Sequence, residues 1–152
     1  MTITSSTHPL DVIEMQSAVL VRNFELLRRR GKAYVDLDSA EYLLLRTLDD
    51  LGPMDIGTLA SALGVDPSTA GRQVSAMGAA GLVDREPAPD DRRRSIISVT
   101  EEGLRRAETV RQRRRQNLAD LLETWSAEDL QTLGTMFDRY NVAVSDRYIA
   151  HA

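Results

Sequence analysis

Apolar residues recur every three or four positions along most of this chain of 152 residues. That spacing puts them on one face of an α-helix, so each stretch in which it persists predicts an amphipathic helix. Asp, Ser or Thr precedes most of these stretches and Gly follows several, as is typical of helix starts and ends. The predicted helices run over residues 10–30, from Asp38 or Ser39 to about Asp50, over 56–63, from Asp66 to Gly81, from Thr100 toward Trp125, and from Ser126 through Val144.

The same spacing predicts the face that each helix buries. The first and last helices carry apolar stripes although they lie far apart in the sequence, so they pack against each other or against a second copy of the chain. The stripes are Ile13, Ser17, Leu20, Phe24 and Leu27; Tyr42, Leu45 and Leu48; Ile56, Leu59, Ala60 and Leu63; Ala70, Val74 and Met77; Leu104, Ala107, Leu118, Leu121, Leu122 and Trp125; and Leu130, Leu133, Phe137, Tyr140 and Val144.

A helix-turn-helix is predicted in the middle of the chain. The helices over 56–63 and from Asp66 onward are joined by about three residues that include Gly64. Asp66 is suited to cap the second helix, and Pro67 fits its first turn because the N–H that proline lacks would be unpaired there. A short inter-helix turn with a glycine is typical of this motif.

A β-hairpin is predicted directly after this motif. One strand begins at Leu82-Val83 and the other covers residues 95–99. Pro87 and Pro89 cannot donate hydrogen bonds to a neighbouring strand, so we expect strand pairing to end there. A loop of this length after a helix-turn-helix is a wing.

The predicted fold is therefore mainly α with a small β-hairpin. It combines a winged helix-turn-helix domain with a helical dimerisation region formed by the N- and C-terminal helices. We expect residues 1–37 to form a dimerisation helix and connector, 38–100 the winged helix-turn-helix, and 101–152 the linker and dimerisation helices.

Composition excludes several classes of function. The chain has no cysteine, which excludes disulfides, thiolate zinc sites, thiol catalysis and thiol redox sensing. We find no signal peptide and no apolar run long enough to span a membrane, so we expect a cytoplasmic protein without a membrane partner. No nucleophile–base pair and no phosphate-cradling loop is present, so we expect neither an enzyme nor a cofactor.

Charge is distributed unevenly. The formal net charge is -4, yet residues 92–115 hold nine Arg against three Glu, a balance of +6. The remaining ten basic and twenty acidic residues give −10. A basic segment in an acidic protein is one sign of a surface that binds nucleic acid, although a charged helix face is also often merely solvated.

A set of short motifs follows a fixed order along the chain. The motifs are Leu51-Gly52-Pro53, Leu59-Ala60, Leu63-Gly64-Val65, Ser68-Thr69, Arg72, Gly81-Leu82-Val83, Asp91-Arg92-Arg93 and Val99-Thr100-Glu101-x-Gly103. This ordered set resembles the MarR family of bacterial transcription regulators. The resemblance implies a winged helix-turn-helix homodimer whose terminal helices form the dimer interface. It also implies a protein that represses genes by binding double-stranded DNA and that is released by small, often phenolic, ligands.

Three features depart from the family pattern. Many relatives carry Val and Thr where this chain has Ala70 and Gly71, and a glycine inside a helix costs about 1 kcal/mol of helix propensity. Relatives that sense oxidants use cysteine, which is absent here. The two histidines, His8 and His151, lie at opposite ends of the chain, so we expect no metal site.

The second helix of the motif holds the residues expected to contact DNA. Ser68 and Thr69 lie at its N-terminus, where free N–H groups favour phosphate. Arg72 is suited to guanine and Gln73 to adenine, and Ser75 completes this set. The alternative is a polar helix face that only meets solvent.

The wing supplies the second group of expected DNA contacts. Arg92, Arg93 and Arg94 can lie along the phosphate backbone or enter a narrow minor groove. We expect Asp90 and Asp91 to orient these guanidinium groups through bidentate bonds. An ordinary charged hairpin tip is the alternative, and the role of the arginines over 105–115 stays open.

A small aromatic or lipophilic effector is expected from the resemblance, at the junction of the dimer helices and the winged unit. The candidate pocket residues are Phe24, Tyr34, Tyr42 and Arg46. We therefore predict a homodimeric repressor of a palindromic operator that a small organic ligand releases. A winged-helix module that binds protein, or a DNA-binding protein without an effector, remains the alternative.

Overall fold

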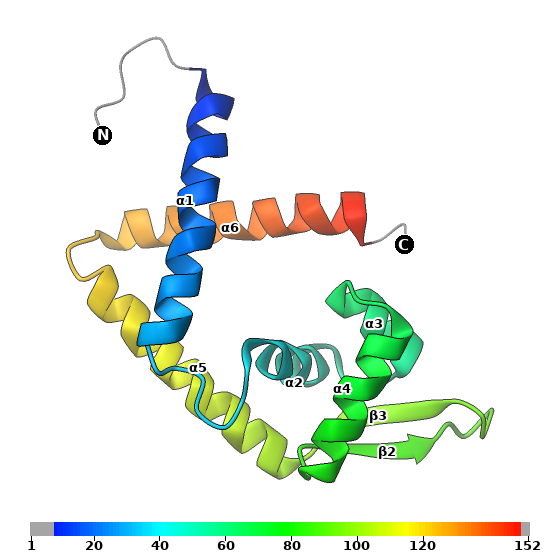
Figure 1. Ribbon diagram of the computed structural model, residues 1–152. Coiled ribbons are helices and arrows are strands. Elements are labelled where there is room, and N and C mark those ends of the chain that lie inside the picture. The colour runs from blue at the N-terminus through cyan, green and yellow to red at the C-terminus, as the bar shows by residue number, and fades with distance from the viewer. Residues whose placement is uncertain (1–7, 150–152) are drawn as a thin grey trace. The chain divides into compact units, whose positions relative to one another are not determined.

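The structure is a computed structural model that describes residues 8–149. The chain divides into two compact units, Met1–Tyr34 and Val35–Ala152. The first unit holds the first helix and the second holds all other elements (Figure 1). The elements are α1 (Pro9–Arg30), α2 (Ser39–Leu51), β1 (Met54–Asp55), α3 (Ile56–Leu63), α4 (Pro67–Ala79), β2 (Val83–Pro87), β3 (Ser95–Val99), α5 (Glu101–Leu121) and α6 (Ala127–Tyr148).

Side chains placed before the helices define where they begin. Each N-cap side chain accepts a hydrogen bond from a backbone N–H of the first turn, as Asp38 does from Glu41 N at 2.8 Å. The sequence left Asp38 and Ser39 as alternatives, and the cap is Asp38. The other caps are His8, Asp55, Asp66, Thr100 and Ser126.

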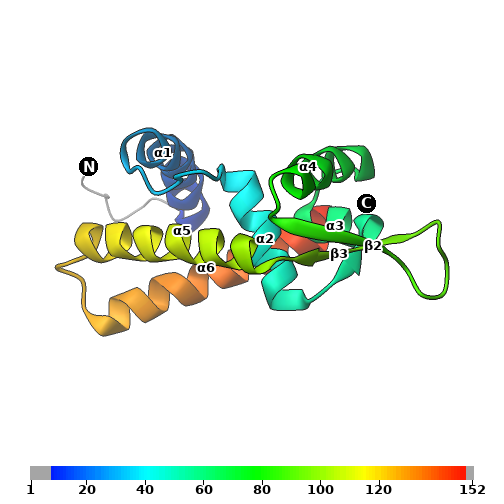
Figure 2. The same ribbon diagram turned by 90° about the horizontal axis from the view of Figure 1, so that it is seen from below.

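A three-stranded antiparallel sheet in the order β1-β3-β2 lies beside the helix-turn-helix. The two-residue strand β1 is too short to leave a pattern in the sequence, and it pairs Met54 with Ile97. The β2–β3 ladder continues to the pair Pro87–Ser95, and Ala88 N still donates to Arg94 O at 2.8 Å. Strand pairing thus ends between the two prolines, as expected. The β2–β3 loop extends away from the helices (Figure 2).

The core of the second unit forms where α2, α3 and α4 pack with the sheet and with the first half of α5. The predicted inward residues of α4 are all buried, which confirms that stripe. In α2 the expectation of an inward Tyr42 is wrong, because Tyr42 is only half-buried and Leu44 is fully buried. A tyrosine needs a polar partner for its hydroxyl, which Arg46 supplies from the same helix. The largest fully buried side chains are Leu44, Leu45, Leu48, Leu59, Val74, Met77, Leu82, Ile97 and Val110.

Apolar stripes of three helices remain largely open to solvent. Helices α1 and α6 contain no buried residue among those described. Helix α5 ends at Leu121, earlier than predicted, and of its expected apolar contacts Ala107 is buried whereas Leu118, Leu121 and Trp125 are exposed. Within residues 8–149, no helix combines the length and apolar character that crossing a bilayer requires.

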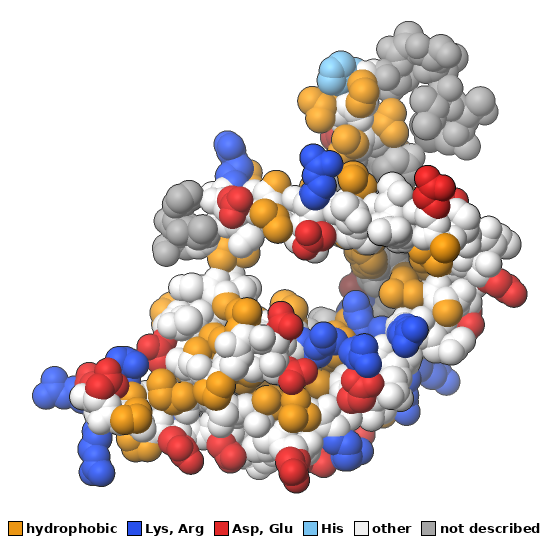
Figure 3. Space-filling view, turned by 180° about the vertical axis from the view of Figure 1, so that it is seen from behind, with side chains coloured by type: hydrophobic (Ala, Val, Ile, Leu, Met, Phe, Trp, Pro, Cys, Tyr) orange, Lys and Arg blue, Asp and Glu red, His pale blue; other side chains and the backbone are white. Residues whose placement is uncertain are grey.

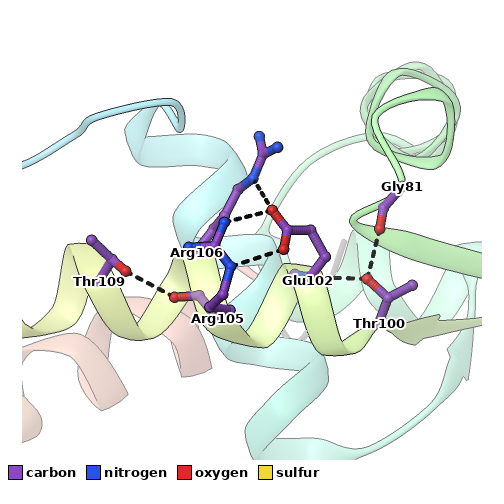
Figure 4. A network of polar contacts seen from close by, with 7 residues as sticks. Gly81, Thr100, Glu102, Arg105, Arg106 and Thr109 are labelled. Carbon is purple, nitrogen blue, oxygen red and sulfur yellow. Dashed lines mark hydrogen bonds and ion pairs between the residues drawn. The ribbon is translucent and has the colours of Figure 1, made fainter.

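Helix α5 begins in direct contact with the end of the helix-turn-helix (Figure 4). The Thr100 hydroxyl donates to Gly81 O at 2.7 Å and accepts from Gly103 N at 3.0 Å. Thr100 N donates to Leu82 O at 3.1 Å. A Cβ at Gly103 would lie 2.2 Å from Leu82 O and 2.9 Å from Val99 Cγ2. Only a glycine therefore allows α5 to approach the backbone this closely.

Replacing Gly103 with Ala should destabilise the fold, because a backbone oxygen cannot move aside for the new methyl group. We expect Gly103→Ala to lower the free energy of unfolding by about 3 kcal/mol, measured by denaturant titration. Gly78→Ala is the matched control, since its Cβ would lie an ordinary 3.9 Å from Val83 O. That variant should gain up to about 1 kcal/mol from helix propensity. Equal stability of the two variants would contradict this packing.

Candidate nucleic-acid interface

The N-terminus of α4 is organised around the carboxylate of Asp66. It accepts from Thr69 N at 2.9 Å, from the Thr69 hydroxyl at 2.9 Å, and from the Ser68 hydroxyl. The hydrogen bond from Ser68, then those from Thr69, hold the pKa of Asp66 well below its usual range. Asp66 therefore stays ionised and occupies the end of the helix that the sequence analysis assigned to a phosphate.

This arrangement changes what Ser68 and Thr69 do. Both hydroxyls donate to Asp66, so a phosphate oxygen must compete with the carboxylate for them. Thr69 also accepts from Arg72 Nη2 at 3.2 Å, which holds the guanidinium over the first turn of the helix. The sequence analysis missed Asp66 as the hub of this network, although its position as N-cap was visible in the sequence.

The structure separates Arg72 from its neighbour Gln73. Arg72 and Ser75 are exposed on the outer side of α4, whereas Gln73 is half-buried. Consecutive residues on a helix point about 100° apart, which follows from 3.6 residues per turn. Gln73 Oε1 is one of two buried side-chain atoms, with Arg46 Nε, that lack a hydrogen-bond partner among the described residues.

The wing tip is a tight turn that presents two arginines. Arg94 N donates to Asp91 O at 3.0 Å, and Arg93 N donates to Asp91 Oδ1 at 3.0 Å. An aspartate at the first position of a turn commonly makes this bond to the backbone. Asp91 therefore shapes the turn through an N–H group and does not orient a guanidinium as expected.

The guanidinium groups of Arg92 and Arg93 make no hydrogen bond or ion pair with residues 8–149 and are exposed at this tip. Arginine side chains, shown in blue, project from this end of the second unit at the lower left of Figure 3.

Arg94 behaves differently from its two neighbours. Its Nε lies 3.1 Å from Asp55 Oδ2, and its Nη1 lies 3.2 Å from Asp90 Oδ2. Asp90 thus contacts a guanidinium through a single bond, where bidentate bonds were expected. Asp55 also caps α3 by accepting from Thr58 N at 2.7 Å, and this bond is the main cause of the lowered pKa of Asp55, with a smaller contribution from Arg94. Arg94 therefore connects the wing to α3.

Several arginines of α5 are paired within their own helix (Figure 4). Glu102 accepts from Arg105 Nη2 at 2.7 Å and from Arg106 Nε at 2.8 Å. These bonds, that from Arg105 first, lower the pKa of Glu102 to about 2. Arg111 pairs in the same way with Glu108, at 2.7 Å. These two glutamates therefore offset two of the six positive charges over residues 105–115.

A small hollow lies between α2 and α5. Its volume is about 250 Å³, and Arg46 reaches it from α2 while its Nη1 donates to Tyr42 OH at 3.2 Å. The Arg114 guanidinium lies over the Tyr42 ring, 5.4 Å from its centroid. The other two candidate ligand residues, Phe24 and Tyr34, belong to the first unit. The hollow is lined by Arg46, Asp49, Leu104, Ala107, Glu108 and Arg111.

The histidines do not meet in the described part of the chain. His8 caps α1 by accepting from Leu10 N at 3.1 Å, and His151 lies outside the described residues. Within residues 8–149, no three His, Asp or Glu side chains gather in a way that could hold a metal ion.

Comparison with solved structures finds proteins of the same fold. The crystal structure of RV1404 from Mycobacterium tuberculosis aligns with a TM-score of 0.72 at 28% identity, covering 91% of this chain and 95% of that one. A mutant of Escherichia coli MarR complexed with operator DNA aligns with a TM-score of 0.68 at 20% identity, covering 88% of this chain and 99% of that one. The latter likeness is one of fold.

Sequence comparison identifies the family. The family model described as MarR family matches residues 37–95. The HTH-type transcriptional regulator YxaD of Bacillus subtilis is 31% identical over 139 residues, which cover 91% of this chain and 97% of YxaD. Such proteins regulate transcription and are not enzymes. The chain therefore belongs to the MarR family of winged helix-turn-helix transcription regulators.

Proposed function

We propose that this regulator is a homodimeric repressor that binds a palindromic operator through α4 and the wing and leaves it when a small organic ligand binds. The observation that carries the proposal is that Arg92 and Arg93, at the tip of the wing, have no side-chain partner among the described residues. Unpaired cations on an acidic protein favour a polyanionic partner. The operator DNA bound by E. coli MarR supports the same type of partner.

Helix α4 and the wing have different roles in this proposal. Arg72 reads a guanine through two acceptors in the major groove, and Ser75 lies on the same exposed side. Ser68 and Thr69 turn from Asp66 toward a phosphate when DNA is present. Gln73 reaches a base only by leaving its half-buried position, so we expect it to contribute least to base recognition.

Arg92 and Arg93 contact the phosphate backbone or a narrow minor groove. Arg94, with Asp90, holds the wing in place. Residues 38–100 form the DNA-binding region in this proposal, and the segments on either side form the dimerisation region.

The charge contacts of the wing and the base contacts of α4 should be distinguishable by experiment. Arg92→Ala with Arg93→Ala removes four phosphate contacts per dimer, so the slope of log affinity against log salt should shrink by up to about 0.9 per contact. Preference for A·T-rich flanks should weaken as well. Arg72→Ala should instead relax one base position per half-site at a cost of about 1–3 kcal/mol. The measurement is a salt titration on duplexes that the wild-type protein selects from a random library.

The matched control is Arg113→Ala with Arg115→Ala, which removes the same charge from α5, where neither side chain has a partner among the described residues. This control should keep the wild-type salt slope. An unchanged slope in the wing variant would show that the wing does not contact DNA. If the wild-type protein selects no duplex, it is a module that binds protein instead.

Exposed apolar faces support the homodimer. Along α6, Leu130 is 43% exposed and Phe137 is 37% exposed, and these residues lie seven positions apart on one side of the helix. Helix α1 exposes Ile13 and Phe24 in the same way, each at 53%. Apolar surface of this extent marks an interface on a stable protein. A dimer also brings two copies of α4 about 34 Å apart, to meet successive major grooves.

Light scattering should give twice the chain mass of 16.9 kDa at micromolar concentration. Leu130→Glu with Phe137→Glu should yield a monomer that binds the operator weakly, because buried unpaired carboxylates oppose association. Gln131→Glu with Thr135→Glu adds the same charge to the opposite side of α6 and should remain dimeric. A wild-type monomer that binds its operator tightly would contradict the proposal that the protein is a dimer.

In the hollow between α2 and α5, Arg46 favours a ligand with a negative charge, whereas Asp49 and Glu108 in the same lining oppose one, so such a ligand must bind at Arg46. Arg46 Nε is buried there without a hydrogen-bond partner among the described residues, so it can donate to a carboxylate. Tyr42 adds an aromatic ring next to Arg46. A small aromatic acid fits both groups, and it releases DNA only if it binds the released state more tightly. Phe24 and Tyr34, the other two candidates, belong to the first unit and do not line this hollow.

Benzoate serves as a probe of this site. It should weaken operator binding by the wild-type protein, whereas Arg46→Ala should bind the operator normally and lose the response. Arg113→Ala, an exposed arginine of α5, should respond like the wild type. If benzoate and larger aromatic acids leave operator affinity unchanged, the protein is a DNA-binding regulator without this class of effector.

A further inference from the structure

Gly71 lies inside α4, where the fold gives no reason for a glycine. A Cβ built at this position would have no atom within 4 Å outside its own helix backbone and chain neighbours. Gly71 is also absent from the positive-φ glycines, which are Gly52, Gly64 and Gly81. The backbone therefore accepts any helix-forming residue here, and the glycine sacrifices helix propensity without an internal benefit.

Two glycines of the second unit have causes within the fold. Gly64 has a φ of 68°, and the side chain of Ile149 would lie 2.9 Å from its Cβ. Gly103 packs against the backbone just before β2. Gly134 in α6 is as open as Gly71, so an open position alone does not indicate a ligand. Gly71 differs from it by lying on the helix that is proposed to contact DNA, so we look for its cause outside the chain.

The position of Gly71 on α4 indicates where that cause lies. It precedes Arg72 by one residue and Ser75 by four, and both of these are exposed. Residues four apart share one face of a helix, so Gly71 and Ser75 lie on the same side. Gly71 is the fifth residue of a helix that begins at Pro67. The N-terminal half of a recognition helix is the part that meets base edges.

We infer that Gly71 is the point at which α4 comes into van der Waals contact with operator DNA, and that a side chain there would hold the helix away from the bases. The inference rests on the proposed function, because DNA supplies the surface that fills the open space. A missing Cβ lets a backbone approach its ligand more closely than any other residue allows. Closer approach lets Arg72 reach further into the major groove. Gly71 therefore affects the preference for the operator sequence by setting how deeply α4 enters the groove.

The test measures folding and binding in the same variants. Gly71→Ala should raise the melting temperature by about 2–4 °C, because it restores helix propensity. The same variant should bind the wild-type operator about 10-fold more weakly, because a methyl group overfills the contact. Gly71→Val should bind more weakly still. The probe is the duplex that the wild-type protein selects from a random library.

Gly78→Ala is the matched control in the same helix. Its Cβ would meet only Val83 O, at 3.9 Å, and it lies two turns beyond Gly71, away from the N-terminal half. This variant should be at least as stable as the wild type and should bind the operator equally well. Binding to unrelated duplexes at low salt should be the same for all variants, because none changes a charge.

The outcomes distinguish a failure of the inference from a failure of the proposed function. A wild-type protein that binds no duplex overturns both. A wild-type protein that binds, with Gly71→Ala binding equally tightly, overturns the inference alone. A lower melting temperature for Gly71→Ala would also overturn it, because the fold would then require the glycine. Equal weakening by Gly71→Ala and Gly78→Ala would assign the effect to helix rigidity and would overturn it as well.

Discussion

The contact between the start of α5 and the backbone at Gly81 and Leu82 determines how the second unit is assembled. The Thr100 hydroxyl is shared between Gly81 O and Gly103 N, and Thr100 N bonds to Leu82 O. These bonds tie the end of the helix-turn-helix, the end of β3 and the beginning of α5 at one place. The direction of α5, and with it everything that α5 carries, follows from this junction.

The sequence predicted most of this architecture because its signals are local. Helix caps, glycine stops and the apolar stripe of α4 depend on residues a few positions apart, and the structure confirms them. Strand β1 depends instead on pairing Met54 with Ile97, more than forty residues away, and two residues carry no periodicity. The prediction that Tyr42 faces inward on α2 was wrong because the spacing of apolar residues takes no account of the polar partner that the Tyr42 hydroxyl requires.

The sequence predicted which types of residue form the candidate site, but it predicted less well which side chains pair with each other. Arginines were expected at the wing, but the sequence does not show which of them are paired. Arg94 is paired with Asp55 and Asp90, whereas Arg92 and Arg93 have no side-chain partner within residues 8–149. Asp91 was expected beside a guanidinium and instead accepts a backbone N–H, because a turn closes at that residue. In α4, neighbouring positions differ in exposure, which separates Arg72 from Gln73. Which side chains pair or become buried depends on residues that are close in space, and the sequence alone does not show this.

Asp55 belongs at once to β1, to the cap of α3 and to the ion pair with Arg94. The wing cannot tilt against the helix-turn-helix without straining the β1–β3 pairing and the ion pair. The wing and α4, the two elements proposed to contact DNA, therefore move as one rigid unit, and motion is left to the joints outside it. In the proposed homodimer, two such units respond more strictly to the distance between half-sites than to the shape of either one.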